Sequence, residues 1–486
     1  MNRTTRTGLI ALASASLLLG IAAPVSATPS PTDLVADIVA GAGGSDPYYL
    51  TAFSGRLYFV ANDGSGDDLF VSDGSVGSAT NLNLNASGAS NPYGFTVIGS
   101  TLYFGADDGV NGTELWSITG TAAPVLVADI ESGAGDSDPN GFTLYNGDIY
   151  FQAYSGVTGQ SLFRLSGGTV SAYPMGAVQA PDDFFVYNGL LYFSASVGSN
   201  IQLFRIDGTN PPSMFFDSNP TGFGNPHRFA IAGGILYFLS NDGANNPSYN
   251  YELYATDGVA VPTQLTTDLS DNNGYQYYAV YNDTLYFSAG NASVGRELGH
   301  TTSGTVPTYF DIFPGATGSF SEGFTAYNGS LYFTATTSAT GFELFSVTGA
   351  GAPTLRADLA AGAGNSFPYD FVVSNGRLAF AAASDGTNWQ LWSFDGTTAN
   401  QESAIVSADA DVFGLTVMGN YVYYSAESTA NGYEVWRTRI AAAAAAAPGL
   451  ANGGAESAIP AGIAAALLLA GLALTLLRRR SAHRVA

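Results

Sequence analysis

The clearest pattern in the chain is a short alternation of apolar and polar residues around the triplet Leu-Tyr-Phe, bounded by glycine, asparagine and aspartate. Each copy lies in a unit with four short stretches rich in aromatic and β-branched residues, the pattern of β-strands separated by turns. The 3.6-residue apolar period of a helix is absent. Four strands in a repeat of about 46 residues predict a β-propeller blade. The nine copies begin 42 to 49 residues apart, at Leu57, Leu102, Ile149, Leu191, Leu236, Leu285, Leu331, Leu378 and Val422.

Two local features predict how a blade forms and how the ring closes. Asn-Gly, as in "AYNGSLYFTA" at 326–335, favours the positive φ angles of a type I′ turn and predicts a two-residue hairpin between two strands. The last strand of a unit reads "LVADI" at 126–130, and a similar segment at 33–38 precedes the first unit, whereas the ninth unit has no such strand. We therefore expect the first strand of the chain to complete the last blade.

The predicted fold is all-β, a single β-propeller of eight or nine four-stranded blades, together with a C-terminal transmembrane helix. Nine blades exceed the usual four to eight. We therefore expect that one unit could be displaced, and the fourth, with its short connection "MGAVQAPDDFF" at 175–185, is the candidate.

The two ends of the chain differ from the repeats. Arginines precede an apolar run that ends in Val25-Ser26-Ala27, which is typical of a secretory signal peptide. Near the other end, an apolar segment followed by arginines predicts a membrane span with its tail in the cytoplasm. The predicted domains are a signal peptide at 1–27, a β-propeller ectodomain at 28–440, an Ala/Gly/Pro-rich linker at 441–460, a transmembrane helix at 461–477 and an Arg-rich cytoplasmic tail at 478–486.

Composition narrows the class of partner. The chain has no cysteine, which excludes disulfides and cysteine metal sites, and its formal net charge is −24. A negative protein repels the phosphate backbone, so nucleic acid is not expected as a partner. The expected partners are an extracellular glycan or protein and, through the C-terminal helix, the cell membrane.

Three segments contain variants of one motif: "DDGVNGTELWSITGT" at 107–121, "NDGANNPSYNYELYATDGV" at 241–259 and "SDGTNWQLWSFDGT" at 384–397. They resemble the ELWxxDGT repeat family of bacterial exported proteins. Glu114-Leu115-Trp116 matches the front of the motif and Asp395-Gly396-Thr397 its back, whereas "RELGHTTSGT" at 296–305 departs at both ends. The resemblance covers all nine units and implies a surface β-propeller, but it supplies no catalytic residues.

The C-terminal region resembles the sortase signal of actinobacterial surface proteins, in which Leu-Ala-x-Thr-Gly precedes an apolar span and an arginine cluster. Here the residues are Leu450-Ala451-Asn452-Gly453-Gly454, so Gly453 stands where the enzyme requires threonine. This departure favours retention by the membrane span over covalent attachment. We expect a secreted, extracellular protein anchored to the membrane or wall of a Gram-positive, actinobacterial cell.

The turns of an antiparallel blade alternate between the two faces of the ring. The longer loops, before "ELW" and after "LVADI", share one face, and we expect ligand binding there. These loops offer the oxygen ligands that calcium prefers, although Asp, Asn and Gly are also ordinary turn residues. The candidate calcium ligands are Asp107, Asp108, Asn111, Glu114, Asp63, Asp67 and Asp68.

Other polar and aromatic residues recur at fixed positions. The Glu of "ELW" and the Asp of "ADI" return in most blades, which favours a structural role at the connection between blades. Most aromatic residues fall on strands and are expected in the core. The aromatic residues predicted to bind a sugar or a protein partner lie in loops: Tyr48, Tyr93, Trp389, Tyr249 and Tyr275.

Sequence evidence for catalysis is thin. The ectodomain has two histidines, His227 and His300, and neither an HExxH nor a GxSxG motif. We therefore expect a non-enzymatic binding or adhesion module at the bacterial surface. The alternative is a glycan-cleaving hydrolase or lyase that uses a carboxylate pair in the propeller funnel, and acids clustered on one part of the ring would favour it.

Overall fold

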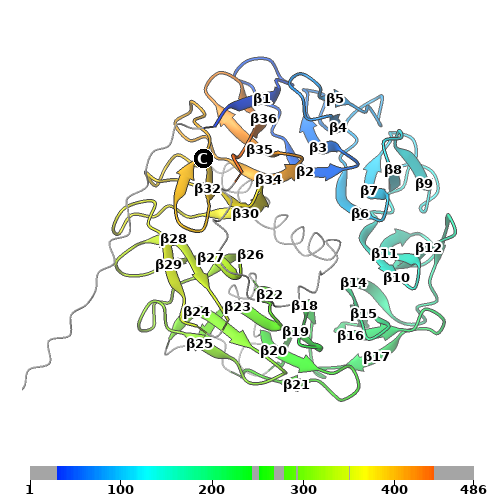
Figure 1. Cartoon of the computed structure of the whole chain (residues 1–486). Helices are drawn as coiled ribbons and strands as arrows, with labels where there is room; N and C mark the ends of the chain where they lie inside the picture. The colour runs from blue at the N-terminus through cyan, green and yellow to red at the C-terminus, as the bar shows by residue number, and fades with distance from the viewer. Residues whose placement is uncertain (1–29, 244–250, 268–277, 292–293, 350, 443–486) are drawn as a thin grey trace, which may run out of the picture.

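The structure is a computed structural model that describes residues 30–243, 251–267, 278–291, 294–349 and 351–442. In these residues the chain forms nine antiparallel sheets of four strands, arranged as blades in one ring (Figure 1). The predicted β-propeller is confirmed, with nine blades. The expectation that the fourth unit is displaced is wrong, because its connection forms a nine-residue first strand, Gln179–Tyr187, that pairs with the second strand despite two register shifts.

In blades one to eight the strands follow one another in chain order from the inner to the outer edge, and in blade nine β1 forms the outer edge beside β36 (Figure 1). Blades one to three contain β2 (Tyr48–Phe53), β3 (Arg56–Asn62), β4 (Asp67–Ser72) and β5 (Thr80–Asn81); β6 (Tyr93–Ile98), β7 (Thr101–Asp107), β8 (Thr113–Thr119) and β9 (Val125–Ala128); and β10 (Asn140–Tyr145), β11 (Asp148–Ser155), β12 (Gly159–Ser166) and β13 (Thr169–Ala172). Blades four to six contain β14 (Gln179–Tyr187), β15 (Leu190–Val197), β16 (Asn200–Ile206) and β17 (Ser213–Phe216); β18 (His227–Ala232), β19 (Ile235–Asn241), β20 (Tyr251–Thr256) and β21 (Thr263–Gln264); and β22 (Tyr278–Tyr281), β23 (Thr284–Asn291), β24 (Gly295–Thr301) and β25 (Thr308–Phe310). Blades seven to nine contain β26 (Glu322–Tyr327), β27 (Ser330–Thr336), β28 (Phe342–Val347) and β29 (Thr354–Ala357); β30 (Tyr369–Ser374), β31 (Arg377–Ala382), β32 (Gln390–Phe394) and β33 (Ala399–Gln401); and β34 (Phe413–Met418), β35 (Tyr421–Ser428), β36 (Gly432–Thr438) and β1 (Thr32–Ala36).

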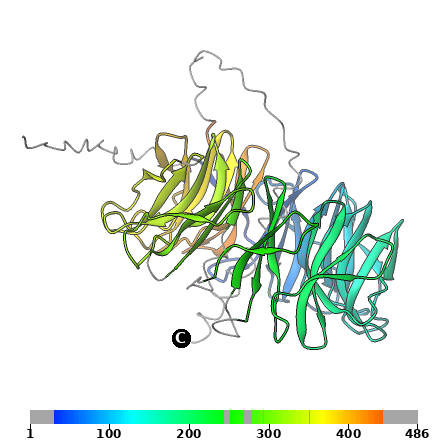
Figure 2. The ribbon, with the colours of Figure 1, turned by 90° about the horizontal axis from the view of Figure 1, so that it is seen from below.

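The first strand of the chain closes the ring, as predicted. β1 pairs antiparallel with β36, and Thr32 lies opposite Thr438 and Leu34 opposite Trp436. The innermost strands of neighbouring blades contact one another all round the ring, including β34 and β2 at the closure. Seen edge-on, the strands run between the two faces of the ring (Figure 2). Closure by β1 leaves the ninth blade with the same number of strands as the others.

The Asn-Gly hairpins have the predicted geometry. Asn146 and Gly147 have φ angles of 50° and 87°, and Asn328 and Gly329 have φ angles of 46° and 75°, so both central residues of each turn are left-handed. The tyrosine before such a turn also joins two blades. Its Oη donates to the carbonyl oxygen of a glycine in the next blade's turn, in the pairs Tyr145–Gly189 (2.9 Å), Tyr187–Gly234 (2.7 Å) and Tyr327–Gly376 (2.8 Å).

The apolar core lies between blades. Each second strand is almost fully buried, and its side chains pack into clusters that contain residues of two neighbouring blades. In one such cluster Val60 of β3 packs with Phe104 of β7 and Phe95 of β6. Burial of the Leu-Tyr-Phe core on both faces explains why this triplet is the least variable part of the repeat.

The predicted signal peptide at 1–27, transmembrane helix at 461–477 and cytoplasmic tail at 478–486 lie outside the described residues, as does the linker beyond residue 442. Within the described part of the chain, no helix has the length and apolar character needed to cross a membrane.

Candidate functional site

A buried acidic residue on the third strand holds the loop that enters the next blade. Glu114 of β8 is fully buried, and its carboxylate accepts hydrogen bonds from the backbone N of Ile130 (2.8 Å) and Glu131 (3.1 Å) and from Ser137 Oγ (2.6 Å). All three donors belong to the connection between β9 and β10. Glu114, a candidate calcium ligand, therefore has its carboxylate oxygens engaged by this connection.

The same acid–serine contact recurs around the ring, and we call it the acid–serine clasp. Burial raises the pKa of four of these acids, Glu114, Glu297, Glu434 and Glu343, the last to about 7. The recurrence supports the interpretation of the "ELW" glutamate as a structural residue. Besides Glu114–Ser137, the clasps are Asp68–Ser90 (2.8 Å), Glu297–Ser319 (2.5 Å), Glu343–Ser366 (2.6 Å) and Glu434–Ser45 (2.7 Å).

The candidate calcium ligands of blade one have two different surroundings. Asp63 and Asp68 share partners, because Ser65 Oγ and Asn81 Nδ2 each donate to both carboxylates. Asp67 Oδ2 instead accepts from Tyr48 Oη at 2.9 Å. The structure therefore brings Asp63 and Asp68 together, while Asp67 fixes an aromatic side chain.

In blade two the candidate ligands shape their own loop. Asp107 Oδ1 accepts from the backbone N of Gly109 (2.6 Å), and Asp108 Oδ1 accepts from the backbone N of Asn111 (2.8 Å). Asn111 Nδ2 donates to Asp108 Oδ2 (2.7 Å). These are the local hydrogen bonds of Asx turns. In the described residues, no group of three or more His, Asp or Glu side chains converges in a way that could hold a metal ion, and calcium binding stays a prediction.

Three of the five aromatic candidates lie at the boundaries between blades. Tyr48, Tyr93 and Trp389 are half-buried, and Tyr249 and Tyr275 lie outside the described residues. Tyr93 covers Gly105, where a Cβ atom would lie 2.5 Å from its Cζ atom. Its Oη and the Trp389 Nε1 atom are buried and have no hydrogen-bond partner within the described chain. Burial, with Asp138 and Asp136 nearby, raises the pKa of Tyr93.

A pocket of about 570 Å³ opens on the loop face between blades four and five. Its walls come from the loop between β17 and β18, from β16 and from the segments around β20. None of the lining residues in the described part of the chain is charged. They are Ile201, Asn219, Thr221, Gly222, Phe223, Asn225, Asn241, Gly243 and Tyr251.

Three asparagines give the pocket its polar character. Asn219 and Asn241 are 4% and 2% exposed, so their amides are held within the wall. Asn241 Oδ1 accepts from the backbone N of Gly243 at 2.7 Å, which curves the loop at that point. Asn225, in a left-handed conformation with φ 46°, donates from Nδ2 to Tyr251 Oη at 2.8 Å. The pocket thus combines amide groups with the rings of Tyr251 and Phe223, the latter 51% exposed.

His227 supports this wall from behind. Its ring lies edge-on to Tyr251, with centroids 4.6 Å apart, and its Nδ1 atom lies 2.8 Å from the carbonyl oxygen of Asn225. Burial lowers the pKa of His227 to about 4. The imidazole is therefore neutral at pH 7, and it orients two residues of the pocket, Asn225 and Tyr251.

The clasp position beside the pocket is not occupied by an acid. On β16 the clasp position holds Gln202, which stands opposite Ala195 as Glu114 stands opposite Ala106. Gln202 Nε2 donates to Asp217 Oδ2 at 2.8 Å instead of receiving a loop serine. The loop after β17 folds around the buried Asn219, whose Nδ2 donates to the carbonyl oxygen of Phe223 at 3.4 Å.

Sequence reasoning placed ligand binding on this face but did not identify the pocket residues. The signal that was present is the departure of "DSNPTGFGNPH" at 217–227 from the loop pattern of other units, rich in Asn and Gly where "ESGAGDSDPN" is acidic. The importance of Tyr251 depends on its contacts with Asn225 and His227, which come from a different element.

Known structures resemble this chain only distantly. No protein-family model matches the sequence, and no curated protein sequence does so either. A prolyl endopeptidase structure aligns over 69% of this chain and 53% of its own, with 11% identity and a TM-score of 0.40. A puromycin hydrolase aligns over 74% of this chain and 61% of its own, with 14% identity and a TM-score of 0.39. The chain therefore spans about half the length of the first and less than two thirds of the second.

Proposed function

We propose that this protein is a non-enzymatic binding module of the cell surface and that the pocket between blades four and five binds a neutral glycan. The observation that supports this most directly is the lining of the pocket, in which, among the residues that the structure describes, amide groups stand beside aromatic rings and no side chain is charged. Amides donate to and accept from sugar hydroxyl groups, and aromatic faces pack against the apolar faces of sugar rings.

The setting of the pocket fits this function. It lies on the loop face, where binding sites of rigid scaffolds usually occur. The formal net charge of −24 disfavours polyanionic ligands and leaves neutral sugars and proteins. Export through residues 1–27 and anchoring through residues 461–477, as predicted from the sequence, would present this face to extracellular glycans.

The test is binding of the purified full chain to an array of neutral and acidic oligosaccharides, followed by calorimetric titration with the best neutral ligand. The variants Asn225→Ala and Phe223→Ala should each weaken that binding by about tenfold, which corresponds to the loss of roughly 1.4 kcal/mol of contact energy.

Asn91→Ala is the matched control. Asn91 also precedes a proline at the start of a first strand and also has a left-handed backbone, with φ 43°, but it lies in blade two. Its replacement should leave the affinity unchanged. Equal losses in the Asn91 and Asn225 variants, or an array with no bound neutral glycan, would refute the proposed site.

A second candidate function is supported by one observation. Asp182 and Asp183 are adjacent and solvent-exposed on the innermost strand β14. Partial desolvation together with Asp182 raises the pKa of Asp183 to about 7, although Arg228 acts in the opposite direction. A carboxyl group that is partly protonated at neutral pH could act as the general acid of a glycosidase. Release of nitrophenol from nitrophenyl glycosides by the wild type, and its loss in Asp183→Asn, would favour hydrolysis over binding alone.

A further inference from the structure

The innermost strands place an aliphatic residue at one level in all nine blades. Each of these residues is the register partner of the first residue of the Leu-Tyr-Phe core on the second strand. They lie at the end of the first strand, just before the hairpin turn that leads to the second strand, which is Asn-Gly in four of the blades. We call this set the collar, and it consists of Ala52, Val97, Leu144, Val186, Ile231, Val280, Ala326, Val373 and Val417.

None of the collar residues is buried, although their register partners are. Leu144 is 53% exposed, Val373 46% and Val97 44%. Because these strands form the inner edge of the ring (Figure 1), the exposed side chains surround its axis. Single exposed apolar residues are normal on a protein surface, but here one recurs at the same register position of every innermost strand, so that nine of them face the same part of the ring.

The described chain ends beside this collar. Ile440, which is 1% exposed, accepts a hydrogen bond through its carbonyl oxygen from Asn375 Nδ2 at 2.9 Å, in the turn that directly follows β30. Its side chain belongs to the same core cluster as Val422, against which the collar residue Val417 packs. The chain therefore leaves the ninth blade on the face that has the collar at its centre.

The segment that follows has the composition to fill the collar. Residues 461–477 are almost entirely Ala, Leu, Ile and Gly, and the intervening stretch 443–460 is rich in Ala and Gly. That stretch could span about 60 Å if fully extended, so its length does not limit docking. Arg478, Arg479 and Arg480 come next, with a charge opposite to the net charge of the chain.

We propose that the collar is a docking site for residues 461–477 of the same chain. Docking would remove two apolar surfaces from water at once, the collar and the segment, and each buried CH₂ group contributes about 0.8 kcal/mol. The ring axis would then be a second apolar environment for a segment whose other expected location is the membrane. Docking and membrane insertion would exclude each other, so the amount of anchored protein would depend on both.

Disulfide cross-linking tests this proposal without background, because the natural chain contains no cysteine. The full chain would carry Leu144→Cys in the collar and Leu469→Cys in the middle of the apolar segment, and would be oxidised with copper phenanthroline at low protein concentration. Val125→Cys with Leu469→Cys is the matched control, because Val125 is as exposed as Leu144 (56%) but lies on the outermost strand β9. Both substitutions are at exposed positions, and unchanged melting temperatures would verify that the variants fold.

We expect the Leu144 pair to form an intramolecular disulfide about tenfold faster than the Val125 pair, as an occupied site raises the local concentration of the segment. Adding Val97→Asp and Val373→Asp to the Leu144 pair should abolish the difference. Equal rates for the two pairs would overturn the proposal. Cross-links found only between chains would also overturn it, and would assign the collar to a second copy.

Discussion

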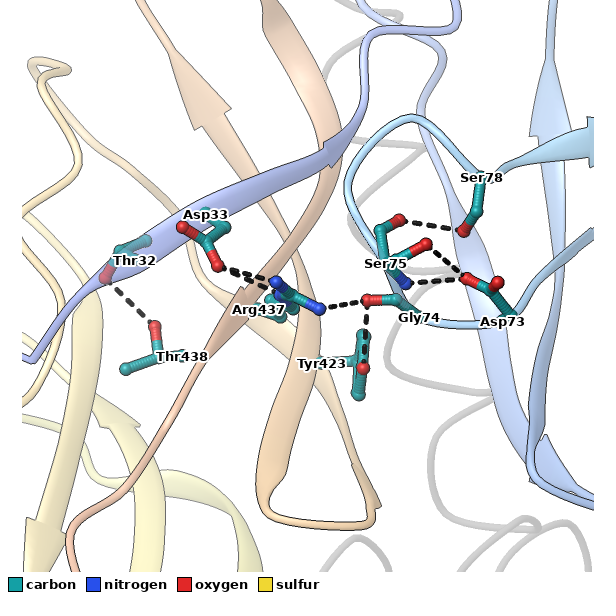
Figure 3. Close-up of polar contacts among 9 residues, drawn as sticks. All are labelled: Thr32, Asp33, Asp73, Gly74, Ser75, Ser78, Tyr423, Arg437 and Thr438. Atoms are coloured by element: carbon teal, nitrogen blue, oxygen red, sulfur yellow. Dashed lines mark hydrogen bonds and ion pairs between the residues drawn. The ribbon is translucent and has the colours of Figure 1, made fainter.

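Arg437 on β36 binds Asp33 on β1 through two nitrogen atoms, with Nε 3.0 Å and Nη2 2.9 Å from the same carboxylate oxygen (Figure 3). Its third nitrogen, Nη1, donates to the carbonyl oxygen of Gly74 in blade one, and the guanidinium group lies 4.4 Å above the ring of Tyr421. One side chain thus connects the first strand of the chain, the ninth blade and the first blade.

Arg437→Ala should lower the free energy of unfolding by about 2 kcal/mol, because the variant loses the charged hydrogen-bond donor that connects β36 with Asp33 of β1 and with Gly74 of blade one. Asp33 is 38% exposed, so the ion pair itself contributes only part of this value. Chemical denaturation of the variant and the wild type measures the difference.

Arg164→Ala is the control for this substitution. Arg164 also pairs with an aspartate, Asp148, but at 3.8 Å and within one blade, with its side chain 35% exposed. Its loss should cost no more than about 0.5 kcal/mol. Similar effects of the two substitutions would show that closure of the ring does not depend on Arg437.

Gly74 leaves no room for a side chain at the closure. A Cβ atom there would lie 2.2 Å from Tyr423 Oη and 2.7 Å from Met418 Cε, and the φ angle is 85°. Gly208 has the same backbone conformation, with φ 87°, but its nearest atoms would lie 3.4 Å away. Both Ala variants should lose about 1 kcal/mol to backbone strain, and Gly74→Ala should lose a further 1 to 3 kcal/mol, roughly the cost of overpacking. Equal melting temperatures for the two variants would contradict this.

The hydroxyl group of the tyrosine before the Asn-Gly turn should by itself contribute to the stability of the propeller. Tyr187→Phe keeps the packing of the aromatic side chain but removes the hydroxyl group that donates to the carbonyl oxygen of Gly234. The free energy of unfolding should therefore fall by about 1 kcal/mol. Tyr154→Phe serves for comparison, because Tyr154 is 45% exposed and should be insensitive to the change. No difference between the two variants would rule out a stabilising role for the interblade hydrogen bond.

The pKa of Glu343 predicts a pH-dependent stability. In the folded state burial raises this pKa from 4.5 to about 7. Between pH 4.5 and 7 the carboxyl group is therefore mostly ionised in the unfolded state and mostly protonated in the folded state, so a rise in pH favours the unfolded state. The stability of the wild type relative to Glu343→Gln should therefore fall by up to about 3 kcal/mol as the pH rises from 4.5 to 7.

Asp73→Asn is the comparison, because the pKa of Asp73 is shifted in the direction opposite to that of Glu343. Hydrogen bonds from Ser75 lower the pKa of Asp73 to about 2, so its contribution is complete above pH 4 and is lost only at lower pH. Thermal melts between pH 5 and 8 should therefore show a constant difference for Asp73→Asn and a changing one for Glu343→Gln. A constant difference for both would mean that Glu343 is ionised throughout.

The sequence was sufficient for the features that every blade repeats. Strand order, the type I′ hairpins of seven blades and closure by the segment at 33–38 followed from the spacing of apolar residues and turns, because these features depend on neighbours along the chain or on a repeated unit. The structural role of Glu114 could be inferred from its recurrence, although its serine partner could not. The displacement of the fourth unit was predicted wrongly. Its first strand, β14, pairs with β15 along its length because two register shifts keep the strands aligned, and the sequence pattern does not indicate these shifts.

The repeat, its strands and the way in which the ends of the ring join can therefore be predicted from the order of residues along the chain. The pocket and the collar, in contrast, could be found only from the packing of the blades in space. The pocket of Asn225 and Tyr251 depends on a loop that folds around Asn219 and meets β20, and the collar depends on nine strands brought to one level around an axis. Both arise from contacts between residues far apart in the chain, and the pattern within a single unit does not specify such contacts.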